Sequence, residues 1–442
     1  MTTTARQLRF RSDAREKVLR GATTLTDAVR MTLGPKSKCV LIERRWGQPI
    51  VSNDGVTIAK EVALVDPDEN LGAQILRQAA ERTGELVGDG TTTSTILAHA
   101  ILAEGMRNVA AGASVVELRR GMDRALHVTV DAVRKLSRPV QSKRERAQVA
   151  TISGHNDATI GELVADALER VGGEGTVSVV GDRRREMLED IGVLTAGRVI
   201  SPEAGMTLEH LKLEDLGRTK RVIVTRETTT IIGGAAEPGA IAGRCNEIRR
   251  QIAESTSDYG KEKLEERLAR LSGGVAVVKV GAPSEAELKN RKEAFEDAIS
   301  ATKAAATEGI VPGGGLVLLR AIDAVDSEIA KLQGDERTGA TLLRHALEAP
   351  TRQIAENSGV DGGVVVEKMR QGTGAYGFDA AAGEYVDLIE AGIIDPTKVV
   401  RVALENAVSV AGTLLLAEAT LTEVREKESE RRHTEPEPAF EA

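Results

Sequence analysis

The sequence predicts a multidomain chain of the α and α/β classes, with mainly helical segments at both ends and an α/β segment between them. Three observations support this prediction. A chain of 442 residues is longer than one hydrophobic core usually supports. Long helical patterns occupy the chain before residue 171 and after residue 284. Between 172 and 281, short strand-like runs alternate with helices.

The N-terminal part is predicted to be helical with one small sheet. A helical pattern at 13–31 stops at Gly34-Pro35, which is a common helix stop. The runs CVLIER (39–44) and PIVSND (49–54) flank the turn-prone stretch RWGQ and resemble a hairpin. Further helices are predicted at 70–87, 91–111, 115–136 and 157–171.

The middle part is predicted to be an α/β unit that is followed by a second helical part. Its strands are expected at 176–180, 198–201, 220–226, 228–232 and 274–280, and its helices at 182–196 and 236–271. A helix is expected at 284–307, and helices dominate to about 424. The stretch 425–442 is charged, contains prolines and has almost no apolar residues, so we expect it to be disordered.

Composition and charge argue against several classes of function. The net charge of -8 argues against a nucleic-acid partner. There is no signal region, and no uninterrupted apolar run approaches the roughly 20 residues of a membrane span. These absences predict a cytoplasmic protein without a membrane partner. Cys39 and Cys245 lack disulfide or zinc spacing and are predicted to be buried thiols.

The stretch LVGDGTTTSTILAHA (86–100) places an aspartate between two glycines at the start of a helix. Glycine permits a positive φ, and the free N–H groups of a helix that begins at Thr91 attract phosphate. Asp89, an anion beside other anions, makes sense mainly as a Mg²⁺ ligand, because hard cations bind carboxylate and phosphate oxygens together. The alternative is that Asp89 is an ordinary N-cap.

Three other segments favour the phosphate-binding interpretation, because each can turn backbone N–H groups toward an anion. They are Thr32-Leu33-Gly34-Pro35, Asn53-Asp54-Gly55 and Gly313-Gly314-Gly315. No Walker-type phosphate loop occurs in the sequence. One G-x-G-x-x-G match, GTGAYG at 372–377, follows a helical pattern rather than a strand, which argues against a Rossmann dehydrogenase.

An ordered set of motifs resembles the group I chaperonins, the GroEL family. The motifs are MTLGPK (31–36), DGVTIAKE (54–61), ENLGAQ (69–74), GDGTTT (88–93), EDAISATKAA (296–305), PGGG (312–315) and GIIDPTKV (392–399). The resemblance covers the chain to about residue 424. It implies a chaperonin fold with a mainly helical equatorial ATPase domain (1–135 and 308–424), a small intermediate domain (136–180 and 276–307) and a truncated α/β apical domain (181–275), followed by the tail (425–442).

The resemblance also implies the residues of an ATP site. Asp89 would bind Mg²⁺, with K⁺ as a further candidate ion, and Asp54 and Asp297 would order the attacking water. The residues implied along the nucleotide and its phosphates are Thr32, Leu33, Gly34, Pro35, Asn53, Gly88, Gly90, Thr91, Thr92 and Thr93. Those implied near the ribose and the base are Gly314, Gly315, Asp379, Ala380, Ala381, Ile393 and Asp395.

Helical periodicity makes an independent prediction about Asp297. On its helix, Leu288, Phe295, Ile299 and Thr302 fall within about 40° of one another, and Asp297 falls on the opposite side. Asp297 is therefore predicted to point away from the packed face. There it would be either a solvated surface carboxylate or, as the resemblance implies, a catalytic group delivered by domain closure.

The sequence departs from the family pattern at three positions and in one long segment. Asn53 stands where group I members typically have a lysine, Arg107 stands at a usual lysine position, and Asp379 replaces a usual asparagine. After 172–180 the chain continues directly into 181–197, which resembles the second half of an apical domain. Roughly 100 residues are thus expected to be missing, by natural loss or by an engineered deletion. In the family, that segment grips unfolded polypeptide and the co-chaperonin.

The predicted function is an ATP-dependent chaperonin subunit that hydrolyses Mg-ATP to drive conformational change in a homo-oligomeric ring. The missing segment puts the binding of unfolded polypeptide and of a GroES-type co-chaperonin in question. The alternative is a non-enzymatic ring scaffold or regulatory subunit that assembles with a full-length chaperonin. Open edges of the N-terminal strand segments are compatible with pairing between subunits.

Overall fold

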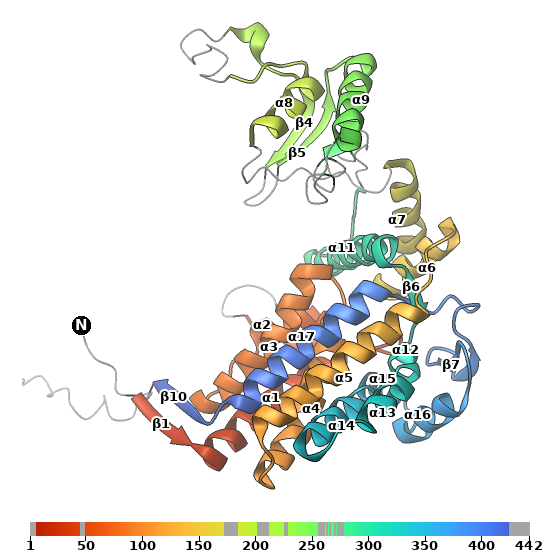
Figure 1. The fold of residues 1–442 in the computed structure, drawn as a ribbon. Coiled ribbons are helices and arrows are strands. Elements are labelled where there is room, and N and C mark those ends of the chain that lie inside the picture. Colours follow the sequence, from red (N-terminus) through yellow and green to blue (C-terminus); the bar gives the residue numbers. More distant parts are fainter. Residues whose placement is uncertain are drawn as a thin grey trace, which may run out of the picture. The chain divides into compact units, whose positions relative to one another are not determined.

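The computed structural model describes residues 6–44, 49–171, 184–200, 212–224, 229–254 and 278–423, and five residues of a helical stretch between 261 and 271. The chain forms two compact units (Figure 1). The larger unit comprises residues 1–162 and 280–442, and the smaller unit comprises 163–279. The larger unit is therefore built from both ends of the chain.

Most of the larger unit is helical, and its strands are short. In chain order its elements are β1 (Arg6–Phe10), α1 (Arg11–Arg30), β2 (Val40–Ile42), β3 (Ile50–Ser52), α2 (Gly55–Glu61), α3 (Pro67–Val87), α4 (Thr91–Ala110), α5 (Val115–Leu136), α6 (Lys143–Ser153), α7 (Ala158–Val171, which continues into the smaller unit), α11 (Glu285–Glu308), β6 (Ile310–Pro312), α12 (Leu316–Arg320), α13 (Ile322–Ile329), α14 (Gly334–Ala346), α15 (Ala349–Asn357), α16 (Gly362–Gln371), β7 (Tyr376–Asp379), β8 (Glu384–Asp387), β9 (Ile394–Pro396), α17 (Thr397–Leu416) and β10 (Ala419–Glu423).

Helix α17 lies in the middle of the larger unit and packs against α3, α4, α5 and α11. By length and composition α17 could cross a membrane, but 67% of its apolar window is buried inside the structure. Its buried face includes Leu404, Val408 and Leu415, which join the main hydrophobic core. The packing of α17 is that of a core helix.

The described strands pair two at a time. The predicted hairpin is confirmed as β2 and β3, which pair antiparallel with Leu41 opposite Val51. Sequence patterns missed the pairs β1–β10, β6–β9 and β7–β8. They also missed helices α2 and α6. The GTGAYG match follows helix α16 and runs into strand β7, which agrees with its rejection as a Rossmann turn.

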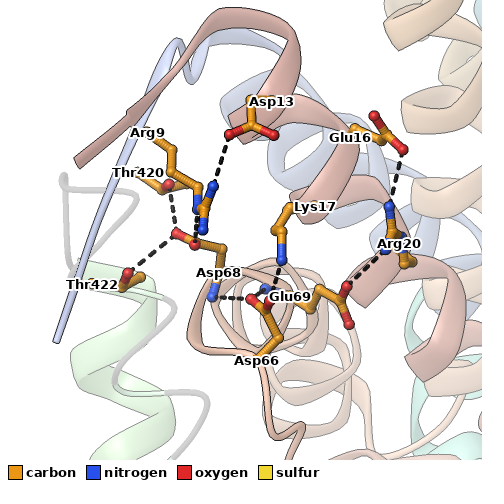
Figure 2. A network of polar contacts seen from close by, with 10 residues as sticks. All are labelled: Arg9, Asp13, Glu16, Lys17, Arg20, Asp66, Asp68, Glu69, Thr420 and Thr422. Carbon is orange, nitrogen blue, oxygen red and sulfur yellow. Dashed lines mark hydrogen bonds and ion pairs between the residues drawn. The ribbon is translucent and has the colours of Figure 1, made fainter. Parts of the chain in front are cut away.

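Strands β1 and β10 join the two ends of the described chain to helix α3 (Figure 2). Asp68, in the first turn of α3, is 2% exposed. It accepts hydrogen bonds from Arg9 Nε at 2.8 Å, Thr420 Oγ1 at 2.7 Å and Thr422 Oγ1 at 3.2 Å. Asp66 caps the same helix and pairs with Lys17 of α1. One buried carboxylate thus holds residues that are more than 350 positions apart.

The smaller unit contains α8 (Arg184–Thr195), η3 (Leu213–Asp215), the antiparallel strands β4 (Thr219–Val224) and β5 (Thr229–Gly234), and α9 (Pro238–Glu254). Strands were also predicted at 198–201 and 274–280, but 198–200 and 278–280 are not strands. The strand at 176–180 and the tail lie outside the described residues. Asp190 is buried here and binds both Arg244 and Arg267.

The two cysteines have different environments. Cys245 of α9 is buried beside Ile248, Leu264 and Leu271, as predicted. The prediction for Cys39 is wrong, because this residue is exposed. Cys39 immediately precedes β2, whose hairpin leaves Leu41 uncovered on the described surface. A hydrophobic run in an exposed hairpin cannot be told from a core strand by periodicity alone.

Two helix crossings in the larger unit depend on reciprocal pairs of glycines. Where α1 meets α3, a Cβ at Gly21 would lie 1.7 Å from the carbonyl oxygen of Glu69, and one at Gly72 would lie 2.2 Å from that of Val18. The crossing of α5 and α14 repeats the arrangement with Gly121 and Gly339, whose added Cβ atoms would lie 1.9 and 2.0 Å from backbone oxygens. The absence of side chains lets these backbones touch.

Gly72→Ala is expected to destabilise the larger unit by at least about 1–3 kcal/mol, because the methyl group would force α1 and α3 apart. Gly412→Ala in α17 is the matched control, since its Cβ would meet only the Arg119 side chain, at 3.7 Å or more. The control should melt at or above the wild-type temperature, because alanine favours a helix more than glycine does. Equal melting temperatures for the two variants would contradict the close crossing.

Candidate functional site

A pocket of about 520 Å³ in the larger unit is lined by all the residues that the family resemblance implied for an ATP site. They come from segments far apart in the chain: the turn after α1 (Thr32, Leu33, Gly34, Pro35), the β3–α2 turn (Asn53, Asp54), the α3–α4 junction (Gly88, Asp89, Gly90, Thr91, Thr92, Thr93), α11 (Asp297), the β6–α12 turn (Gly314, Gly315), the end of β7 with the turn after it (Asp379, Ala380, Ala381), and β9 with the residue before it (Ile393, Asp395). The structure brings these residues together, and their individual roles stay predictions.

The junction of α3 and α4 requires its two glycines. Gly88 ends α3 with φ 72° and Gly90 begins α4 with φ 78°, both left-handed. A Cβ at Gly88 would lie 2.3 Å from that of Ser300, and one at Gly90 would lie 2.7 Å from Val399 Cγ1. The N-cap of α4 is Gly90, without a side-chain cap. The alternative that Asp89 caps this helix is therefore wrong.

Two other loops are fastened to the start of α4. In the turn after α1, the Thr32 hydroxyl lies 3.0 Å from the Thr92 hydroxyl of α4. The same turn is also held by α15, because Asn357 Nδ2 donates to the carbonyl oxygen of Leu33 at 2.8 Å. A Cβ at Gly55 would lie 2.3 Å from Thr92 Oγ1, so the β3–α2 turn also touches α4. These contacts bring the free N–H groups of one helix and the hydroxyls of a threonine run to one wall of the pocket.

Three of the five aspartates that line the pocket come from the α3–α4 junction, the β3–α2 turn and α11. Asp89 is held by Ser153 Oγ at 2.6 Å and by the Gly90 N–H at 2.5 Å. Asp54 caps α2 and accepts from the Thr57 N–H at 2.7 Å. Burial, followed by the charges of Asp89 and Asp54, raises the pKa of Asp297 to about 9. Burial likewise raises the pKa of Asp89.

This acidic cluster fits a divalent cation. Buried like charges repel one another, and a cation among them removes that cost. Within the described ranges, no group of three His, Cys, Asp or Glu side chains lies close enough to hold a metal ion. Mg²⁺ does not require such a group, since it is commonly bound by one or two carboxylates together with phosphate oxygens and water. Asp89 is the side chain that fits this mode.

The predicted orientation of Asp297 is wrong. The buried face of α11 is a stripe of alanines that includes Ala294, Ala298, Ala301 and Ala305, and Asp297 lies at its border and lines the pocket. The larger apolar residues of this helix are only partly covered, and Leu288 is exposed. Hydrophobic periodicity misjudged the face because the closest packing is made by the smallest side chains.

Pairing of β6 with β9 forms the opposite part of the pocket wall. The Gly313 N–H donates to the Ile393 carbonyl at 2.9 Å, and the pairing places the β6–α12 turn beside Asp395. Burial, with Asp89 as a further cause, raises the pKa of Asp395 to about 7. Asp379 instead accepts from the N–H groups of Ala381 and Ala382 and orders its own turn.

Sequence patterns missed the part of the pocket that comes from α6 and the turn after it. Gln148, Thr151, Ser153, His155 and Asn156 all line the pocket. A signal for the helix was present in the sequence, because Ser142 and Glu145 form a capping box at its start. No phosphate-binding pattern marks the turn itself.

Three comparisons with known proteins all find chaperonins as the similar proteins. The profile of the TCP-1/cpn60 chaperonin family matches residues 25–176 and 174–425. Chaperonin GroEL 5 from Bradyrhizobium diazoefficiens is 51% identical over 529 aligned positions, which cover 96% of this chain and 98% of that protein. A crystal structure of a group III chaperonin in the open state superposes with a TM-score of 0.66 at 22% identity and covers 92% of this chain and 99% of that one.

Proposed function

Since this chain belongs to the TCP-1/cpn60 chaperonin family, we propose that it binds and hydrolyses Mg-ATP as a subunit of a homo-oligomeric ring. Family membership carries a chaperone function in protein folding, and the fold is the predicted chaperonin fold. We assign the chain to group I on its motifs and on its identity with GroEL 5. We further propose that it acts in the cytoplasm.

One observation carries the ATPase proposal: separate loops from both ends of the chain meet at one pocket that presents free helix N–H groups, threonine hydroxyls and carboxylates. Asp89 would hold Mg²⁺, which supplies positive charge against the charge that develops during phosphoryl transfer. Asp54 is fixed by the first N–H groups of α2, so its carboxylate can order a water molecule. The loop amides and Thr91 to Thr93 would bind phosphate oxygens.

The raised pKa of Asp297 gives this residue a role that depends on ligand binding. In the pocket alone, burial and the neighbouring carboxylates favour the protonated form of Asp297. A magnesium ion held at Asp89 would lower the pKa of neighbouring carboxyl groups, so binding of the metal favours the ionised form of Asp297. We propose that Asp297 becomes a competent base, together with Asp54, when the nucleotide is in place.

Ring assembly would use strand edges of the larger unit. The ribbons β1–β10 and β2–β3 each have two strands, and each carries exposed apolar cross-strand pairs, Leu8 with Leu421 and Leu41 with Val51. Unpaired edges of this kind pair readily with another chain. We propose that they meet in neighbouring copies. The equatorial, intermediate and apical limits given above remain our proposed domain division. Of the proposed intermediate segments 136–180 and 276–307, residues 136–162 and 280–307 belong to the larger unit.

A scaffold or regulatory subunit is the second candidate function. The 529 aligned positions exceed the 442 residues of this chain, so the relative carries residues that this chain lacks. This supports the proposed loss of apical sequence, which would impair binding of unfolded polypeptide and of a co-chaperonin. Refolding of a denatured enzyme, with and without co-chaperonin, separates the candidates. Refolding that matches an intact chaperonin would exclude the scaffold.

The assembled protein is expected to release phosphate from ATP in the presence of Mg²⁺ and to stop when EDTA removes the metal. The measurement is steady-state phosphate release, made on the fraction whose mass in solution corresponds to an oligomer. Potassium and sodium salts are compared in the same assay to test the further candidate ion. An oligomer that binds Mg-ATP without hydrolysing it would contradict the ATPase and favour the scaffold.

A further inference from the structure

The pocket has an unusual balance of charged side chains. Five aspartates are among the described residues that line it, and no lysine or arginine is among them. The aspartates are Asp54, Asp89, Asp297, Asp379 and Asp395. A polyphosphate would add more negative charge, and neutral amides and hydroxyls provide no net positive charge against it. His155 is the one described lining side chain that can become a cation.

The turn after α6 holds His155 in a costly backbone conformation. His155 has φ 59° and Asn156 has φ 61°, and left-handed residues with a Cβ are disfavoured. The conformation is fixed from both sides. The Asn156 N–H donates to the Thr151 carbonyl at 2.8 Å, and Asp157 accepts from the Thr159 N–H at 2.8 Å and starts α7. The direction in which the imidazole leaves the backbone is therefore determined by the fold.

The same turn is tied to the carboxylate that we assign to Mg²⁺. Ser153, two residues before His155, donates to Asp89 at 2.6 Å. Burial raises the pKa of Asp89, and the charge of His155 acts against that rise, so the imidazole lies within electrostatic reach of Asp89. Within the described part of the chain, the exposed His155 side chain makes no hydrogen bond or ion pair, which leaves it available to a ligand.

We propose that His155 donates a hydrogen bond from its imidazole to the phosphate chain of the bound nucleotide. The inference rests on the proposed binding of Mg-ATP and specifies how the phosphates are held. Asn53 is neutral and lines the same pocket, so it contributes no charge. His155 is thus a binding residue for the phosphates and has no role in recognising the base.

The test compares the binding of Mg-ATP, Mg-ADP and adenosine to the assembled protein by calorimetry. His155→Ala should weaken both Mg-nucleotides ~10–100-fold, the range for a lost hydrogen bond to a charged group, and leave adenosine unchanged. His155→Lys should restore most of the affinity for the Mg-nucleotides. His127→Ala, on the exposed side of α5, is the matched control and should bind like the wild type.

Each of the following results would contradict a claim made above. Wild-type affinity for Mg-ATP in His155→Ala would remove the phosphate contact while the proposed ATPase stands. Equal losses for adenosine and Mg-ATP, or no rescue by lysine, would show that His155 acts only through the shape of the turn. A wild-type oligomer that binds no Mg-ATP would overturn the proposed function and this inference together. Ring mass and melting temperature of each variant show that the fold is kept.

Discussion

Asp297→Ala is expected to slow ATP hydrolysis by about 10²–10⁴-fold, the usual range for loss of general-base assistance. Binding of Mg-ATP should be retained, because the substitution leaves the proposed metal-binding and phosphate-binding residues in place. An unfolded or disturbed protein cannot lose hydrolysis and keep this binding. Single-turnover hydrolysis and calorimetric binding measure them separately.

Glu296→Ala is the matched control for Asp297. Glu296 is the adjacent carboxylate on α11, its side chain is 61% exposed, and it pairs with Lys292 at 3.3 Å on the surface. Its removal should leave hydrolysis within about twofold of the wild type, because Glu296 does not line the pocket and an exposed ion pair contributes little to the stability of α11. Equal losses in both variants would indicate damage to α11. Unchanged hydrolysis in Asp297→Ala would remove this residue from catalysis.

Asp89→Asn is expected to abolish most of the magnesium-dependent binding of ATP. Removing one charge of a buried charge contact costs about 2–5 kcal/mol, which corresponds to a roughly 30-fold to several-thousand-fold loss of affinity. The amide has the same shape and can still accept from Ser153. Without nucleotide, the variant should melt above the wild type, because a buried neutral amide costs less than a buried carboxylate.

Asp157→Asn provides the control for this second substitution. Asp157 starts α7 by accepting from Thr159, lies outside the residues that line the pocket, and can be replaced by asparagine because both residues cap helices well. Thermal melting with and without Mg-ATP reports binding and stability in one measurement. If Mg-ATP raises the melting temperature of Asp89→Asn as much as that of the wild type, Asp89 does not hold the metal.

Long amphipathic helices were predictable because many residues contribute to each pattern. The expected helix at 115–136 coincides with α5, and the starts and ends of α4 and α7 differ from prediction by one residue at most. Strands β6 and β9 were not predictable in the same way. Each has three residues, and each gains its stability from a partner that lies more than 80 positions away in the chain.

The candidate site was predictable wherever a loop carries glycine beside threonine or aspartate, because few other structures need that combination. The motifs around Gly34, Asp54, Asp89 and Gly314 all reach the pocket. His155 could not be found in this way, since a histidine in a turn carries no signature of its own. The proposed role of His155 depends on the absence of lysine and arginine among the described lining residues. Only the folded arrangement reveals this absence.

The joining of β1 to β10 through Asp68 has a consequence for biosynthesis. A ribosome adds roughly 5–20 residues per second, so the N-terminal helices emerge tens of seconds before α17 and β10, which complete their core. Until then the inner faces of α3, α4 and α5 are exposed to solvent. A protein whose family assists the folding of others thus itself leaves a large apolar surface open during its own translation, until α17 and β10 have been made.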